Sequence, residues 1–149
     1  MGEAACNRAL KQMVFILIDG YNFIRQVETY KTIEEKGLVY GREKFLKELE
    51  AYGCRTGHNI TVVFDAAGSP CFEESQERYA GIDVIYTQRG VSADQRIVEI
   101  VKEHSDAHYD VVVVSADKLV QYGTLQNAGF TLSPREFDLA IKGGTALSY

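Results

Sequence analysis

The longest apolar run of the chain spans Met13 to Ile18, six consecutive residues that are rich in branched side chains. Such a run is typical of a strand buried on both faces, and strands of this kind belong to parallel sheets covered by helices. The run ends on Asp19. Functional groups gather at the carboxyl ends of strands in open parallel sheets, so Asp19 stands where a site is expected. Gly20 lets the backbone turn away, and Asn22 is close enough in sequence to reach the same crevice.

Strand and helix patterns alternate along the rest of the chain. Short runs rich in Val, Ile and Phe predict strands at residues 60–64, 82–86, 111–114 and 130–132. The run at 82–86 is the least apolar and is therefore expected at an edge of the sheet. Helical spacing or exposed charge predicts helices at residues 41–53, 72–79, 92–104 and 118–127, and from 133 onward, where Ser133 and Glu136 form a capping box. Residues 25–41 are interpreted as a helical turn followed by a mobile loop, and 66–70 as a loop.

This alternation predicts an α/β fold with three layers, α/β/α, around a mostly parallel sheet of about five strands. A chain of 149 residues with 46% hydrophobic and 25% charged residues is expected to form one packed domain. We expect that domain to span residues 13–142, between a flexible N-terminal extension at 1–12 and a C-terminal tail at 143–149.

Charge and cysteine content narrow the classes of protein. The formal net charge of −5 argues against a domain that coats nucleic acid electrostatically, although it allows one that holds a phosphate through a metal. The three cysteines, Cys6, Cys54 and Cys71, form no CxxC pair, which fits a reducing cytoplasm. The sequence contains no apolar run near the roughly 20 residues needed to cross a bilayer, so no membrane partner is expected.

Four aspartates occupy matching positions in the predicted topology. Asp19, Asp65 and Asp117 follow the ends of buried strands, and Asp94 opens the helix before the strand at 111–114. Like charges packed together are costly unless they are protonated or bound to cations, so a convergent acidic cluster implies a divalent metal. Ligands that are all oxygen favour Mg²⁺ or Mn²⁺ over zinc.

Each of these residues also has a simpler structural interpretation. A single Asp after a strand usually caps a helix or forms a turn, Asp94 favours the dipole of its helix, and Ser115 is a possible cap. Asn22 fits a turn as well as a site. The three histidines are expected on the surface. Four aspartates at equivalent positions favour a site more strongly than any one of them does alone.

Taken together, these motifs resemble the NYN domain, a relative of PIN-like nucleases, and more closely its bacterial YacP-like branch. The matching segments, which fall between about residues 13 and 142, are Ile18-Asp19-Gly20-Tyr21-Asn22, Val63-Phe64-Asp65-Ala66, Ser92-Ala93-Asp94, Val114-Ser115-Ala116-Asp117 and Leu132-Ser133-Pro134-Arg135-Glu136. The resemblance implies a PIN-like fold and a metal-dependent endoribonuclease. It also implies metal ligands at Asp19, Asp94 and Asp117, with Asp65 in or just outside the ligand set and with Asn22 and Ser115 orienting ligands or waters.

The chain departs from the family where many relatives carry a further acid. Gln95 and Val98 occupy the expected positions here, and Glu99 comes one residue later. A site of this composition is expected to hold one metal more tightly than a second. The missing acid also keeps a rival open, namely a catalytically silent module that binds RNA or the ribosome.

The expected substrate is single-stranded RNA, with messenger RNA and the translating ribosome as candidate substrate and presenter. Tyr21 and Tyr86 are candidates to stack a base, and the basic candidates for phosphate binding are Arg25, Arg89, Arg96, Lys118, Lys31 and Lys36. Two other classes fit poorly. A phosphatase of the haloacid dehalogenase type needs a second Asp where Tyr21 stands, and a Rossmann-like nucleotide binder needs a glycine-rich loop after the first strand.

Overall fold

A computed structural model describes residues 14–34, 37–66, 73–143 and 147–149. Within these ranges the chain forms a six-stranded sheet in the order β3-β4-β2-β1-β5-β6. All neighbouring strands run parallel except β3, which pairs antiparallel with β4. The strands are β1 Val14–Asp19, β2 Asn59–Phe64, β3 Ser75–Tyr79, β4 Ile82–Tyr86, β5 Asp110–Val114 and β6 Phe130–Leu132.

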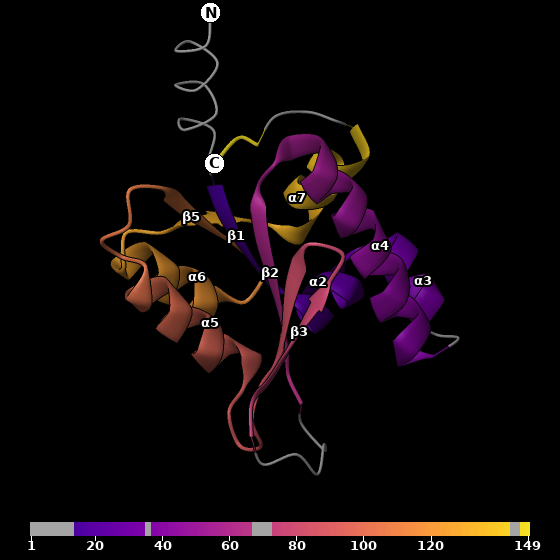
Figure 1. The fold of residues 1–149 in the computed structure, drawn as a ribbon, viewed down its shortest axis with the longest axis horizontal. Coiled ribbons are helices and arrows are strands. Elements are labelled where there is room, and N and C mark those ends of the chain that lie inside the picture. Colours follow the sequence, from indigo (N-terminus) through magenta and orange to yellow (C-terminus); the bar gives the residue numbers. More distant parts are fainter. Residues whose placement is uncertain (1–13, 35–36, 67–72, 144–146) are drawn as a thin grey trace, which may run out of the picture.

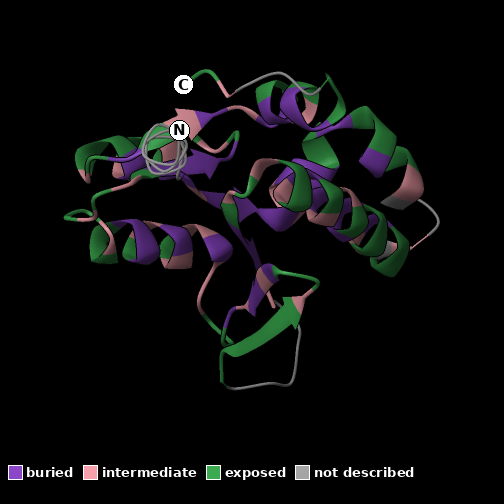
Figure 2. Cartoon of the chain, turned by 45° about the horizontal axis from the view of Figure 1, so that its top comes forward, coloured by how far each residue is buried: buried purple, intermediate pink, exposed green. Residues whose placement is uncertain are grey.

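Helices cover both faces of this sheet, so the predicted three-layer α/β/α architecture is confirmed (Figure 1). One face carries α2 Gly20–Gln26, α3 Glu28–Glu34, α4 Leu38–Thr56 and α7 Pro134–Gly143, whereas the other carries α5 Ala93–Glu103 and α6 Lys118–Gln126. Figure 2 shows the buried residues concentrated between these layers, as expected for one core on each side of the sheet.

The central strand β1 explains why there are two cores. Ile16 and Ile18 pack into the layer beneath α2, α4 and α7, whereas Leu17 between them packs beneath α5 and α6. All three side chains are fully buried. The continuous apolar run therefore marks a strand covered on both faces, as the sequence predicts.

One segment differs from its prediction in type. The charged stretch that predicts a helix at 72–79 forms the strand β3 instead, and residues 67–72 lie outside the described ranges. Four of the five β3 residues are exposed, so their polar side chains are compatible with a strand that has no layer to cover it. Charged residues also protect an exposed sheet edge against pairing with other chains. This added strand makes the sheet six strands wide, and the strand at 82–86 lies inside it rather than at its edge.

A second difference concerns the stretch predicted as a turn and a loop at 25–41. It contains the end of α2, all of α3 and the start of α4, which begins at Leu38 rather than at Gly41. Buried Ile24, Val27 and Tyr30 fix this segment against the core. Because the helix is interrupted at Val27, α2 and α3 are each too short to show a sustained helical period. Of the two lysines predicted here, Lys31 is exposed on α3 and Lys36 lies outside the described residues.

Several local predictions are confirmed. Ser92 caps α5, and its capping box is completed by Gln95. Ser133 and Glu136 form the predicted capping box at α7 through reciprocal hydrogen bonds of 3.1 Å.

At the C-terminal end, Tyr149 donates a hydrogen bond of 2.6 Å to Asp110. Burial and this bond raise the pKa of Tyr149 to about 12.

The order of the strands creates a crevice beside β1. The chain moves from β1 outward to β2 and β4, then crosses back through α5 to place β5 on the opposite side of β1. Open parallel sheets bind ligands at the carboxyl ends of the strands where such a reversal occurs.

In the described part of the chain, no helix has the length and apolar character needed to span a bilayer.

Candidate functional site

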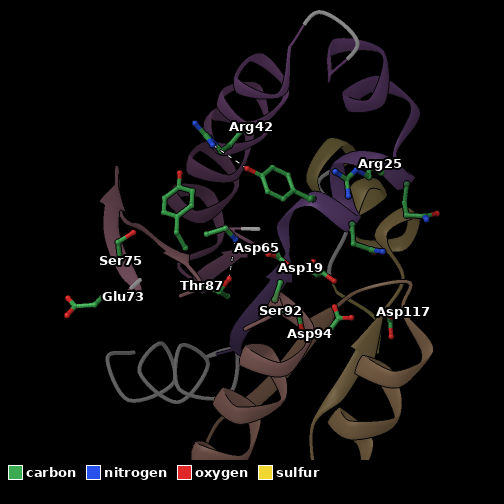
Figure 3. Close-up of a pocket in the computed structure, with 16 residues that line it drawn as sticks. Asp19, Arg25, Arg42, Asp65, Glu73, Ser75, Thr87, Ser92, Asp94 and Asp117 are labelled. Carbon is green, nitrogen blue, oxygen red and sulfur yellow. Dashed lines mark hydrogen bonds between the residues drawn. The ribbon is translucent and has the colours of Figure 1, made fainter. Parts of the chain in front are cut away.

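A cleft of about 680 Å³ opens at the carboxyl ends of β1, β2 and β4 (Figure 3). All four predicted aspartates contribute to its lining, although they come from separate parts of the chain. The other predicted site residues in the lining are Tyr21, Asn22, Arg25 and Tyr86. The topology therefore brings the predicted acidic residues to one place.

Asp19 lies deepest among the acidic residues of the cleft. It is the last residue of β1 and is only 6% exposed. It occupies the position before α2 where a side chain usually caps the helix, but its carboxylate makes no capping hydrogen bond. Burial, followed by the nearby charge of Asp94, raises the pKa of Asp19 to about 7. The simple explanation of Asp19 as a helix cap is therefore wrong.

Gly20 allows β1 to pass directly into α2 behind this carboxylate. A Cβ atom at Gly20 would lie 2.4 Å from Cε1 of the buried Phe64 ring. The glycine is required by this close approach of β1 to the ring at the end of β2, since Gly20 adopts no positive φ.

Ser115 and Asn22 connect the end of β5 to the β1–α2 junction. The Ser115 hydroxyl donates to Asp19 Oδ2 at 3.4 Å and accepts the N–H of Asp117 at 3.1 Å. Asn22 Oδ1 accepts the backbone N–H of Ala116 at 2.9 Å. These bonds position the loop that carries Asp117 relative to Asp19.

Asp117 both lines the cleft and caps α6. Its Oδ1 accepts the backbone N–H groups of Leu119 at 2.8 Å and Val120 at 3.1 Å. The capping interpretation is therefore correct for one oxygen of Asp117. It is not correct for Ser115, whose hydroxyl interacts with Asp19 and with the Asp117 backbone.

Asp94 lies in the first turn of α5 and lines the cleft together with Asp19 and Asp117. Burial, followed by the charge of Asp117, raises the pKa of Asp94. Asp65 follows β2, and the next residue, Ala66, donates its N–H to Thr87 Oγ1 at 3.2 Å. That bond ties the Asp65 segment to the end of β4.

The donor set of the cleft has the chemistry expected for a hard divalent cation. Its acidic side chains supply only oxygen atoms. Burial, followed by repulsion between the carboxylates, raises the pKa values of Asp19 and Asp94, and a bound cation would relieve that repulsion. Within the described ranges, no three His, Cys, Asp or Glu side chains are already grouped to hold an ion.

The predicted basic residues do not converge as the aspartates do. Of those that the structure describes, only Arg25 lines the cleft, where its guanidinium lies 5.6 Å from the centre of the Tyr21 ring. Arg96 lies on α5 and pairs with Glu74 at 2.6 Å, as well as with Glu99 and Glu103. Arg89 and Lys118 are exposed and do not contribute to the cleft lining.

The sequence interpretation missed Arg42 and Thr87, both of which line the cleft. Arg42 falls one turn before the buried Phe45 and Leu46 on the same face of α4. An arginine on the otherwise apolar face of a predicted helix is the sequence feature that could have identified Arg42 as a site residue. Thr87, just after β4, carried no comparable signal.

The positions of the missing acid are occupied by residues that do not reach the cleft. Gln95 completes the capping box with Ser92, and Val98 packs against Gly123 on α6. Glu99 pairs with Arg96 at 3.4 Å. These three residues line an adjoining groove between α5 and α6, which shares Ser92 and Asp94 with the cleft.

Comparison with known proteins agrees with this architecture. The chain is 26% identical over 124 residues to the uncharacterized protein YacP of Bacillus subtilis strain 168, a match that covers 83% of this chain and 72% of the relative. It resembles a crystal structure of a mutant of Rae1 (YacP) from Bacillus subtilis, with a TM-score of 0.76, 23% identity and coverage of 88% of this chain and 76% of the other. A second Rae1 (YacP) crystal structure gives a TM-score of 0.70 at 21% identity, covering 87% of this chain and 74% of that one. These structural likenesses support the PIN-like fold.

The family itself is established by sequence. A family model for the YacP-like NYN domain matches residues 16–145, which include all four cleft aspartates. The chain therefore belongs to the YacP-like NYN domain family.

Proposed function

We propose that this protein is an endoribonuclease that cleaves single-stranded RNA with Mg²⁺ or Mn²⁺. The observation that carries the proposal is Asp19, a buried carboxylate that makes no capping hydrogen bond and shares the cleft with Asp94 and Asp117, whose charges add to burial in raising its pKa. Such a group is costly to keep charged, which fits a residue that acts by binding a cation. The nuclease-like fold of the family supports the same reaction class.

In this proposal Asp19, Asp94 and Asp117 hold the metal, and Asp65 completes or supports the set. A metal bound there supplies an activated water and neutralises charge on the phosphodiester. Ser115 orients the Asp19 carboxylate through its hydroxyl, and Asn22 holds the loop before Asp117. No side chain of the cleft is required as a nucleophile, since water can attack the phosphorus.

The direct test is cleavage of a labelled single-stranded RNA with Mn²⁺ or Mg²⁺, compared with the same reaction in a chelator. Wild type should cut only with metal, and Asp19→Asn should lower the rate by at least about a hundredfold, as expected when a ligand of the catalytic metal is lost. Asp106→Asn is the matched control because Asp106 is exposed and does not line the cleft. Unchanged cleavage by Asp19→Asn would overturn the assignment.

A catalytically silent RNA-binding module is the second candidate. It is favoured by the absence of a grouped set of three acidic ligands in the described ranges and by the noncatalytic contacts of Gln95 and Val98. Metal-independent RNA binding without cleavage would support this alternative. Metal-dependent cleavage that is lost in Asp19→Asn would exclude it.

Messenger RNA presented by the ribosome in the cytoplasm is the substrate and partner we propose. The reason is electrostatic, because a protein of net charge −5 should attract free RNA only weakly. A presenting particle would supply the missing affinity. Cleavage of the same RNA naked and in a translation extract tests this point, and equally efficient cutting of naked RNA would remove the need for a presenter.

A further inference from the structure

Arg42 reaches the cleft from α4 and is held there by two tyrosines. Its Nη1 donates a hydrogen bond of 3.3 Å to the hydroxyl of Tyr21, and its guanidinium lies 5.6 Å from the centre of the Tyr86 ring. Tyr21 and Tyr86 in turn contact the buried Phe64 ring, at centroid distances of 4.7 Å and 5.7 Å. Figure 3 shows Arg42 on the side of the cleft away from Asp94 and Asp117.

The guanidinium of Arg42 keeps most of its hydrogen-bonding capacity. A guanidinium has five N–H donors, and this one makes a single hydrogen bond and no ion pair within 4.0 Å among the described residues. Arg96 differs, because three carboxylates lie within salt-bridge distance of it. Arg42 is therefore an ordered arginine whose remaining donors have no acidic partner at that distance in the described part of the chain.

The position of Arg42 suits a phosphate better than a carboxylate of the protein. Arg25 and Arg42 are the two basic side chains that line the cleft in the described part of the chain, and Asp94 and Asp117 lie on the side away from Arg42 in Figure 3. An RNA strand that places one phosphate at the acidic side needs a cation for the phosphate beside it. The planar fork of arginine matches a phosphate with two parallel hydrogen bonds.

We propose that Arg42 binds the phosphate next to the scissile one, and that Tyr21 is a positioning residue that holds Arg42 for this contact. This inference rests on the proposed function, since it assumes that the cleft takes RNA. It also assigns Tyr21 and Tyr86 a role other than base stacking, namely to orient a guanidinium. The substrate class is therefore an RNA strand with at least one phosphate beside the cleaved bond.

The test combines binding with cleavage. RNA binding is measured by fluorescence anisotropy in chelator at low salt, and KM and kcat are measured with Mn²⁺, for wild type, Arg42→Ala and Arg42→Lys. Arg78→Ala is the matched control, because it removes the same charge from an exposed arginine outside the cleft lining. Arg42→Ala should weaken binding about tenfold or more, raise KM more than it lowers kcat, and reduce the salt slope of binding by about 0.7.

Arg42→Lys should keep the salt slope but recover only part of the affinity, because lysine lacks the planar fork. Tyr21→Phe should weaken binding in the wild-type background and have no further effect in Arg42→Ala, since it acts through Arg42. An RNA with an uncharged methylphosphonate beside the cleaved bond should lose affinity for wild type and not for Arg42→Ala.

The outcomes separate this inference from the proposed function. Weaker binding by Arg42→Ala together with an absence of cleavage by wild type would support the phosphate contact and reject the nuclease. Metal-dependent cleavage with equal RNA binding and equal KM in wild type and Arg42→Ala would overturn the phosphate contact alone. Failure of wild type to bind RNA in chelator at low salt would also overturn it.

Discussion

Ser115 donates a hydrogen bond to Asp19 between two neighbouring strands, with Ser115 Oγ 3.4 Å from Asp19 Oδ2. The same hydroxyl oxygen accepts the backbone N–H of Asp117 at 3.1 Å. Ser115 is fully buried, and Asp19 is nearly so. One hydroxyl group therefore links two of the proposed metal ligands.

Replacing Ser115 by alanine should weaken metal binding without removing a ligand. In wild type, the hydrogen bond from Ser115 lowers the pKa of Asp19. Without this bond the pKa of Asp19 should rise, so protons should compete with Mn²⁺ for the carboxylate up to a higher pH. We expect a loss of about 1–2 kcal/mol in unfolding free energy as well. Thermal unfolding across a Mn²⁺ titration at several pH values measures both effects. Ser105→Ala, at an exposed turn, is the control, and identical metal affinity in the two variants would contradict this role for Ser115.

The raised pKa of Asp19 predicts how stability depends on pH in the absence of metal. Its pKa is 3.8 when unperturbed and about 7 in the folded protein, chiefly because of burial. At pH values between these two pKa values, Asp19 is protonated in the folded state and ionised in the unfolded state. The contribution of Asp19 to stability therefore falls as pH rises from about 4 to about 7. At pH 8, Asp19→Asn should therefore be more stable than wild type, by up to about 4 kcal/mol.

Chemical denaturation of both proteins in chelator, at pH 5 and pH 8, measures this difference. Asp106→Asn controls for the loss of one surface charge. A divalent cation should reverse the effect, because it binds the ionised carboxylate and stabilises wild type more than the variant. A wild-type protein in chelator that gains stability between pH 5 and pH 8 relative to Asp19→Asn would contradict the assigned pKa.

Gly20 gives a prediction about packing behind the site. Alanine there would place its Cβ 2.4 Å from the Phe64 ring, which is fully buried and has little room to move. We expect Gly20→Ala to lower the unfolding free energy by about 1–3 kcal/mol, as overpacking does in a dense core.

Gly53→Ala is the matched control for Gly20→Ala. A Cβ at Gly53 would lie 3.5 Å from its nearest neighbours, and the residue is inside α4, so alanine should be neutral or stabilising by up to about 1 kcal/mol. Adding Phe64→Leu should restore part of the stability lost in Gly20→Ala, because it removes the atoms that clash. Denaturant unfolding of the single and double variants decides the point, and equal stability of both glycine variants would argue against the close approach.

The sequence predicts the parts of this molecule that depend on local pattern. The buried strands and the capped helices are visible because apolar runs and capping residues are adjacent in the chain. The shared cleft of Asp19, Asp65, Asp94 and Asp117 is also predictable, because parallel strands carry their carboxyl ends to one edge. Their mutual distances are not predictable in this way, since they depend on rotamers and on the cap that Asp117 forms.

The failed predictions depend on contacts between distant segments. The β3 residues are exposed whether the segment is a helix or an edge strand, and pairing with β4 decides between the two. Arg42 is a site residue only because α4 brings it beside Tyr21, which lies 21 positions earlier in the chain. Arg96 has a side chain suited to binding phosphate, but Glu74, directly before β3, forms an ion pair with it.

The form of the RNA follows from the depth of Asp19. This carboxylate is 6% exposed at the base of a cleft that has side chains of α2 and α4 on one side and those of α5 on the other. A flexible single strand can bend one phosphate toward it, whereas an A-form duplex is rigid and presents its phosphates on a broad cylinder. We expect cleavage of an RNA annealed to its complement to be slower than cleavage of the free strand by at least about a hundredfold. A duplex with a short unpaired gap at the cut position is the control, and cleavage there should return because the strand regains its flexibility. Equal rates for the free strand and the complete duplex would show that the buried carboxylate does not restrict the substrate to single strands.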